Sequence, residues 1–322
     1  SGGTKTSELI DSILVPAFFN PALNALGDGA VLPGGERLVF STDSFVVSPW
    51  KFPGGDIGKL AVCGTVNDVC MAGGEPKYLS LSLILEEGFA VENLRQIVSS
   101  AAETAARCGV QIVTGDTKVV ERGKGDQVYV NTSGIGVLRA SGLGREAVRP
   151  GDAVVVSGPV GCHGAAVMMA RGELPCEGEL LSDCMPLHAL SRALIEVGGL
   201  RIMRDPTRGG LATTLNEFAE GLPFTIEISE AAVPVTPGVR AACELLGLDP
   251  LYCACEGRIV AVIAPERAEA ALAALRALPG GEGAAQIGRV TEQRPGKVVL
   301  RTGLGGSRLL GKLAGGQLPR IC

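Results

Sequence analysis

Four aspartates interrupt apolar segments of this 322-residue chain and are the first candidates for a functional site. They are Asp28, Asp43, Asp68 and Asp116. Carboxylate oxygens are the ligands that magnesium prefers, and a carboxylate within an apolar strand must reach solvent or be compensated by a cation or hydrogen bonds. Each aspartate alone is more often a helix cap or a turn residue. Together they favour a site that binds magnesium and phosphate.

A second signal is the segment 114–118, which reads Thr-Gly-Asp-Thr-Lys and follows a short apolar stretch. Gly115 permits close backbone approach, Asp116 offers a metal ligand, and Lys118 offers a positive charge to phosphate. The residues Ser1, Gly2 and Gly3 precede a helical pattern, and amides at a helix start are suited to cradle phosphate. The plainer alternatives are a loop with a solvated lysine and an ordinary flexible N-terminus. Neither a Walker motif nor a GxGxxG motif occurs.

The second half of the chain adds an acid, an imidazole and a charged loop. Residues 204–210 read Arg-Asp-Pro-Thr-Arg-Gly-Gly, in which Asp205 either caps the next helix or serves a ligand. Glu256 follows Cys255 and is either a general base or a turn residue. His163 is one of two histidines, and a lone histidine is more often structural than catalytic.

The chain ends in a thiol, Cys322, after a glycine-rich stretch. Glycine-rich segments bend at little cost, so we expect a flexible tail that delivers this thiol to a distant pocket. The alternative is a disordered end that happens to finish in cysteine.

Composition narrows the class of protein. The net charge of −5 and the pI near 5.3 argue against nonspecific binding to nucleic acid or to an anionic membrane. We find no transmembrane segment and no signal peptide, and we expect a cytoplasmic enzyme. The ten cysteines are scattered through a chain large enough to have its own core, so we expect reduced thiols and no zinc site.

Periodicity predicts two α/β domains. A turn at residues 149–152 divides the chain into residues 1–149, residues 150–302 and a tail at 303–322. Alternation and apolar runs predict strands at 37–47, 78–85, 110–114, 127–138, 153–157, 224–229, 258–264, 286–291 and 297–301. Helical spacing predicts helices at 57–72, 91–108, 164–170, 186–197, 209–220, 237–246 and 265–278.

Seven segments together resemble the HypE family of hydrogenase maturation factors, and the likeness runs nearly end to end. They are residues 1–3, 41–44, 52–60, 67–68, 114–118, 204–210 and 319–322. The internal segments alone are similar to a wider ATP-dependent family that includes aminoimidazole ribonucleotide synthetase, selenophosphate synthetase and thiamine-monophosphate kinase. The terminal Pro-Arg-Ile-Cys singles out HypE within it. Two departures stand near the site: Cys162 where Asp is expected, and Cys255 where a relative can carry Asn.

The resemblance implies an α/β (α+β) protein of two-domain PurM-like architecture. Its N-terminal domain would bind ATP and magnesium and form a dimeric sheet or barrel, its C-terminal domain would be an α/β sandwich, and a flexible tail would follow. The implied partners are a second copy of the chain, a HypF-type carbamoyltransferase and the HypC–HypD complex. The implied activity is ATP-dependent dehydration of a carbamoyl group on Cys322 to a thiocyanate, the source of the cyanide ligand of nickel-iron hydrogenase.

The resemblance also assigns roles to residues. Asp43, Asp68 and Asp116, with Asp28 as a fourth, would hold magnesium. Glu256 is the first candidate base, His163 the second, and Lys118 would neutralise developing phosphate charge. The expected nucleotide-site residues are Ser1, Gly2, Gly3, Asp43, Asn67, Asp68, Gly115, Asp116, Thr117, Lys118, Asp205 and Arg208.

Two competing functions stay open on sequence grounds. One is a small-molecule ATP-dependent synthetase or kinase of the same superfamily, in which Cys322 is incidental. The other is a carrier or scaffold that only presents a thiol to its partners.

Overall fold

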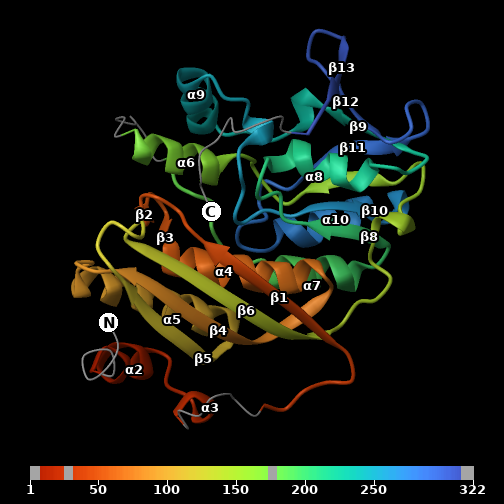
Figure 1. The fold of residues 1–322 in the computed structure, drawn as a ribbon. Helices are drawn as coiled ribbons and strands as arrows, with labels where there is room; N and C mark the ends of the chain where they lie inside the picture. The colour runs from red at the N-terminus through yellow and green to blue at the C-terminus, as the bar shows by residue number, and fades with distance from the viewer. Residues whose placement is uncertain (1–7, 25–31, 173–179, 313–322) are drawn as a thin grey trace.

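The computed structural model describes residues 8–24, 32–172 and 180–312, and its two large β-sheets fall on either side of the predicted division at residues 149–150 (Figure 1). Five residues with predicted roles lie outside the described residues: Ser1, Gly2, Gly3, Asp28 and Cys322. Within the described residues, no helix is both long and apolar enough to cross a membrane.

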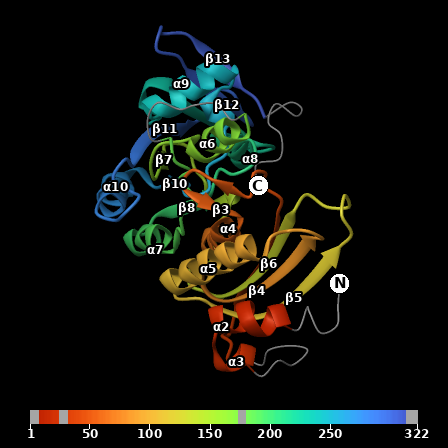
Figure 2. The same ribbon diagram turned by 90° about the vertical axis from the view of Figure 1, so that its left-hand side faces the viewer.

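The N-terminal half is a four-stranded sheet covered on one face by two helices, as Figure 2 shows. Its strand order is β1 (Leu38–Phe45), β6 (Val128–Leu138), β4 (Gly74–Glu86) and β5 (Gln111–Val120). The covering helices are α4 (Ile57–Met71) and α5 (Val91–Cys108). Leu79, Leu81, Leu83 and Leu85 alternate along β4 and are buried beneath these helices, as the period of a strand requires. The small elements of this half are η1 (Ile10–Leu14), α2 (Val15–Ala17), α3 (Pro21–Asn24), β2 (Lys51–Phe52) and β3 (Gly55–Asp56).

Helix α4 is the central helix of the molecule, between the four-stranded sheet and the C-terminal half (Figure 1). Asp56 caps its start by accepting hydrogen bonds from the backbone N–H groups of Gly58 and Lys59 at 2.8 and 3.0 Å. Nearly every residue of α4 is buried, as expected of a helix that is apolar all round. A Cβ atom on Gly58 would lie 2.2 Å from the carbonyl oxygen of Ile97, so glycine lets α4 pack closely against α5.

The C-terminal half is a seven-stranded sheet, and β9 with β12 is the one parallel pair among the described strands of this sheet. The strand order is β13 (Ser307–Leu310), β12 (Lys297–Arg301), β9 (Thr225–Ser229), β11 (Ala285–Thr291), β7 (Ala153–Val156), β10 (Val260–Ile263) and β8 (Leu200–Arg204). The α-helices of this half are α6 (Cys162–Arg171), α7 (His188–Val197), α8 (Gly210–Ala219), α9 (Pro237–Leu246) and α10 (Ala268–Arg276). Short 3-10 turns are η2 (Arg145–Ala147), η3 (Glu230–Ala232), η4 (Pro250–Tyr252) and η5 (Pro265–Arg267).

The predicted elements agree with the structure except at sheet edges and loops. Helices α5 and α9 have the predicted bounds. The sequence analysis missed strands β8 and β13 and the β2–β3 hairpin. Strand β13 lies within the segment predicted as a tail, and Leu310 at its end is buried, so the folded sheet continues to that residue.

Candidate active site

A cavity of about 540 Å³ lies where the two halves meet, and carboxylates from both halves line it. The N-terminal half contributes Asp43 and Asp68. The C-terminal half contributes Asp205, Arg208 and Glu256. The fold therefore gathers five of the residues predicted to act on a ligand, although they are spread over more than two hundred positions of the sequence.

A glycine lets β1 and α4 approach closely enough to bring Asp43 and Asp68 to this cavity. A Cβ atom on Gly64 of α4 would lie 2.8 Å from ring atoms of Phe45 on β1, so only glycine fits there without a shift. The hydroxyl of Ser41 donates to Asp68 Oδ2 at 2.8 Å. Burial raises the pKa of both aspartates, and the charge of Asp68 raises that of Asp43 further.

Asp205 is the most perturbed of the three aspartates in the cavity. It directly follows β8 and is 6% exposed. Burial raises its pKa to about 7, and the charges of Asp68 and Asp43 act in the same direction. A cation bound among these carboxylates would relieve that repulsion, so the electrostatics suit a metal ion.

The carboxylates do not form a complete metal cage by themselves. Among the described residues, no group of three or more His, Cys, Asp or Glu side chains is placed to hold a metal ion. Magnesium in nucleotide sites is commonly held by only one or two carboxylates together with the phosphates. Asp43 and Asp68 therefore fit an ion that arrives with a nucleotide, rather than an ion held by protein alone.

Glu256 carries a carboxyl group that is buried without compensation. The residue is 2% exposed, and in the described part of the chain its Oε1 atom has no hydrogen-bond partner. Burial, and after it the neighbouring Cys184 and Asp205, hold its pKa well above the usual range. Its backbone is anchored, since its carbonyl accepts from the N–H of Met185 at 3.4 Å. A carboxyl group whose pKa is raised in this way is, once ionised, a stronger base than a carboxylate in water.

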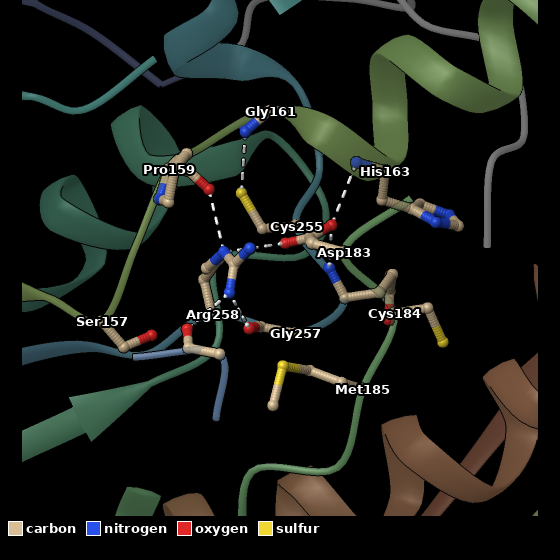
Figure 3. A network of polar contacts seen from close by, with 12 residues as sticks. Ser157, Pro159, Gly161, His163, Asp183, Cys184, Met185, Cys255, Gly257 and Arg258 are labelled. Atoms are coloured by element: carbon tan, nitrogen blue, oxygen red, sulfur yellow. Dashed lines mark hydrogen bonds and ion pairs between the residues drawn. The ribbon is translucent and has the colours of Figure 1, made fainter. Parts of the chain in front are cut away.

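His163 lies at the start of α6 and is fully buried. Its Nδ1 atom is 2.8 Å from the hydroxyl of Ser182, and its ring packs edge-to-face on Phe52 with the ring centroids 5.2 Å apart. Its backbone N–H donates to Oδ1 of Asp183 at 3.0 Å, and the same oxygen accepts from the N–H of Glu256 at 3.3 Å. Figure 3 shows this network around Asp183. The two candidate bases therefore share one anchoring oxygen.

Asn67, which the sequence analysis assigned to the nucleotide site, hydrogen-bonds to the C-terminal half of the molecule. It is fully buried, and its Nδ2 atom donates to the carbonyl oxygens of Met185 at 3.2 Å and Glu256 at 3.3 Å. Its Oδ1 atom accepts from the N–H of Leu187 at 2.8 Å. The side chain joins α4 to the C-terminal half and leaves no exposed surface for a ligand.

The segment 114–118 lies on β5, at the opposite edge of the four-stranded sheet from β1. Three strand spacings, about 14 Å, therefore separate Asp116 from Asp43 within one chain. Lys118 Nζ is 2.6 Å from Asp116 Oδ1, and both side chains are exposed. Thr117 is buried, and its N–H donates to the same Asp116 oxygen at 2.8 Å. In a single chain these residues do not join the cavity that Asp43 lines.

Asp183 and Ser182 are the residues of this region that the sequence analysis did not single out. They stand in a segment without helical or strand periodicity, and an aspartate there is indistinguishable from a turn residue. Only the fold reveals that a single carboxylate contacts two distant segments.

Comparison with known proteins then decides the family. The family models for the AIR synthase related protein match residues 26–138 with the N-terminal domain and residues 149–301 with the C-terminal domain. Carbamoyl dehydratase HypE of Cupriavidus necator is 51% identical over 100% of this chain and 93% of the relative. The chain belongs to the HypE family. The crystal structure of hydrogenase maturation protein HypE in complex with ATP covers 100% of this chain and 98% of that chain, with 48% identity and a TM-score of 0.97.

A second solved HypE structure is a complex with another protein. The crystal structure of the HypE–HypF complex matches 95% of this HypE-family chain and 99% of the HypE-like chain in it, with 44% identity and a TM-score of 0.83. The two-domain PurM-like architecture expected from the resemblance is thereby confirmed.

Proposed function

We propose that this chain uses ATP to dehydrate an S-carbamoyl group on its own Cys322 to a thiocyanate, and so supplies the cyanide ligand for nickel-iron hydrogenase maturation. The observation that carries the proposal is the buried, uncompensated carboxyl group of Glu256 in a cavity shared with Asp43, Asp68, Asp205 and Arg208. That cavity combines a strong base with an acidic cluster suited to a magnesium-bound nucleotide. The relatives named carbamoyl dehydratase support the assignment.

The chemistry requires the carbamoyl oxygen to become a good leaving group. That oxygen attacks the terminal phosphorus of ATP, ADP departs, and one proton leaves the carbamoyl nitrogen. Loss of the second nitrogen proton then expels phosphate and leaves S–C≡N. Glu256 is our candidate to accept a proton from nitrogen, and His163 is the second candidate. Magnesium would neutralise charge on the phosphates, with Asp43 and Asp68 as its protein ligands.

A second copy of the chain would complete the site. Asp116 and Lys118 lie far from the cavity of their own chain, at an exposed sheet edge. One face of that sheet also exposes apolar side chains, which we call the open face: Phe40, Tyr78, Ile84, Tyr129 and Ile135. Pairing two open faces in a homodimer would cover these side chains and bring Asp116 and Lys118 to the partner's cavity.

The proposed partners are the proteins that would act immediately before and after this reaction. A HypF-type carbamoyltransferase would load Cys322, as the HypE–HypF complex supports, and the HypC–HypD complex would accept the nitrile. All of these steps would take place in the cytoplasm, where a terminal thiol stays reduced.

The proposal is tested by the mass of the C-terminal peptide. The chain is first carbamoylated by the transferase and then incubated with ATP and magnesium. We expect the wild-type peptide to lose the mass of one water molecule. Glu256→Gln should retain the carbamoyl group unchanged, and Cys322→Ala should never acquire it. A Cys322→Ala protein that processes its physiological substrate at the wild-type rate would instead indicate a small-molecule synthetase or kinase, and a carrier would show carbamoylation without water loss.

A further inference from the structure

Residues 182–187 form a strap that connects the two halves of the molecule. The backbone N–H of Ser182 donates to the carbonyl oxygen of Pro53 at 2.8 Å, and the N–H of Leu187 donates to Asn67 Oδ1 at 2.8 Å. Both acceptors belong to the N-terminal half. The strap is therefore fixed at each end, and its second residue, Asp183, points back into the C-terminal half (Figure 3).

The side chain of Asp183 has no exposed surface and contacts the backbones of both candidate bases. Its Oδ1 atom accepts from the N–H groups of His163 at 3.0 Å and Glu256 at 3.3 Å. The adjacent Ser182 hydroxyl is 2.8 Å from Nδ1 of the His163 ring. Two consecutive residues of the strap thus hold the backbone of one base and both the backbone and ring of the other.

An arginine compensates the charge of this buried carboxylate and ties the same two segments together. Nε of Arg258 is 3.6 Å from Asp183 Oδ2 and donates to the carbonyl of Pro159, which precedes α6, at 2.9 Å. Its Nη1 atom donates to the carbonyl of Gly257, which follows Glu256, at 3.2 Å. The approach is close, because a Cβ atom on Gly257 would lie 1.8 Å from the carbonyl oxygen of Asp183.

We propose that Asp183 is a positioning residue for the dehydration, which acts by fixing the backbones of His163 and Glu256 relative to each other. The inference rests on the proposed function for its chemistry and on the geometry above for its placement. Misplacement of a reacting group by about 1 Å can cost on the order of 100-fold in rate, so a shared anchor for two bases has a large kinetic effect. Loss of a buried carboxylate that served only the fold would lower stability without this specific effect on the rate of dehydration.

The chain offers a matched control in Asp152. This aspartate is also buried, accepts from the backbone N–H of Arg149 at 2.7 Å, and lies 3.3 Å from Nε of Arg201. Like Asp183, it has a buried side chain, accepts a hydrogen bond from a backbone N–H group and pairs with an arginine. None of its contacts involves His163 or Glu256.

The test compares Asp183→Ala, Asp183→Asn and Asp152→Ala in the full chain. The readouts are the single-turnover rate of water loss from the carbamoylated tail and the affinity for ATP. We expect Asp183→Ala to slow water loss on the order of 100-fold with ATP affinity within about twofold of wild type. Asp183→Asn keeps an acceptor oxygen and should recover most of the rate. Asp152→Ala should keep the wild-type rate, and an equal slowing in that variant would overturn the proposal.

A second readout does not depend on turnover. His163 and His188 are the two histidines of the chain, so ring-labelled histidine gives two sets of ¹⁵N signals, which His163→Gln assigns. We expect Asp183→Ala, or Asp183→Asn to a smaller degree if the alanine variant does not fold, to shift the His163 signals and leave those of His188 in place. Unchanged His163 signals would refute the positioning role. If the wild type itself never loses water, the proposed function fails, while these signals still decide the role of Asp183.

Discussion

At the scale of single residues, the cavity holds three aspartates, and the pKa of Asp205 is raised the most. Asp205 is buried, and the charges of Asp68 and Asp43 oppose its ionisation. Its pKa of about 7 means that the folded protein holds a proton which the unfolded chain, with the ordinary value of 3.8, releases at lower pH. Between these two values stability must therefore fall as pH rises, since the folded state binds more protons than the unfolded state.

The Asp205→Asn variant should remove this dependence. At pH 8 the penalty on the wild type is at most about 4 kcal/mol, because one pKa unit corresponds to about 1.4 kcal/mol. We expect the variant to be more stable than wild type at pH 8 and to lose that advantage near pH 4, as measured by denaturant unfolding without nucleotide. Asp116→Asn is the control, since Lys118 lowers the pKa of Asp116 and the variant should gain no stability at high pH. An advantage for Asp205→Asn that does not vary with pH would contradict the assignment.

At the scale of elements, Gly115 shows how a residue predicted to approach a ligand is also required by strand packing. A Cβ atom at this position would lie 2.1 Å from the backbone carbonyl oxygen of Leu81 on β4. Gly115→Ala should therefore separate β5 from β4 and cost about 1–3 kcal/mol of unfolding free energy. Gly34→Ala, where nothing lies within 4 Å of the added atom, is the matched control. A Gly115→Ala protein with wild-type stability and weakened ATP binding would instead support a direct role at the nucleotide.

The elements that could be predicted are those with strong local signals. Helix α5 has a single apolar stripe and ends at Gly109 in the left-handed conformation, and α9 begins with Thr236 and Pro237 and ends at Gly247. Strand β8 lacks such signals, because it is a short edge strand with mostly half-buried residues. Strand β13 follows a run of glycines and gains its order from pairing with β12, which local sequence does not encode.

The same limit applies to the site. The sequence pointed to Asp43, Asp68, Asp205 and Glu256, and the structure gathers them in one cavity. The sequence did not distinguish these four residues from Asp116, which the strand order places at the far edge of the sheet. Asp183 could not be found at all, because its role depends on contacts with segments 20 and 73 positions away.

At the scale of the whole molecule, the two halves are connected at the cavity by polar contacts as well as by the apolar core. Asn67 of α4 contacts both the strap and the Glu256 backbone, so the spacing between the acidic cluster and the candidate base is fixed by direct hydrogen bonds. The exposed pair Asp116 and Lys118 lies at the far edge of the sheet from this cavity. Within a single chain, these two residues do not reach it.

The open face allows a test of whether a second copy of the chain brings Asp116 and Lys118 to the cavity. Phe40 is 67% exposed and pairs in register with Ile135, which pairs with Tyr78, so apolar side chains follow one another across three strands. Phe40→Asp would place a charge within the proposed homodimer interface but cost the isolated chain little stability. We expect sedimentation to show a wild-type dimer and a monomeric Phe40→Asp protein that has lost ATP-dependent activity. Phe19→Asp, at a comparably exposed phenylalanine outside the four strands of this sheet, should remain dimeric and active. A Phe40→Asp dimer, or an active monomer, would show that Asp116 and Lys118 act without a partner.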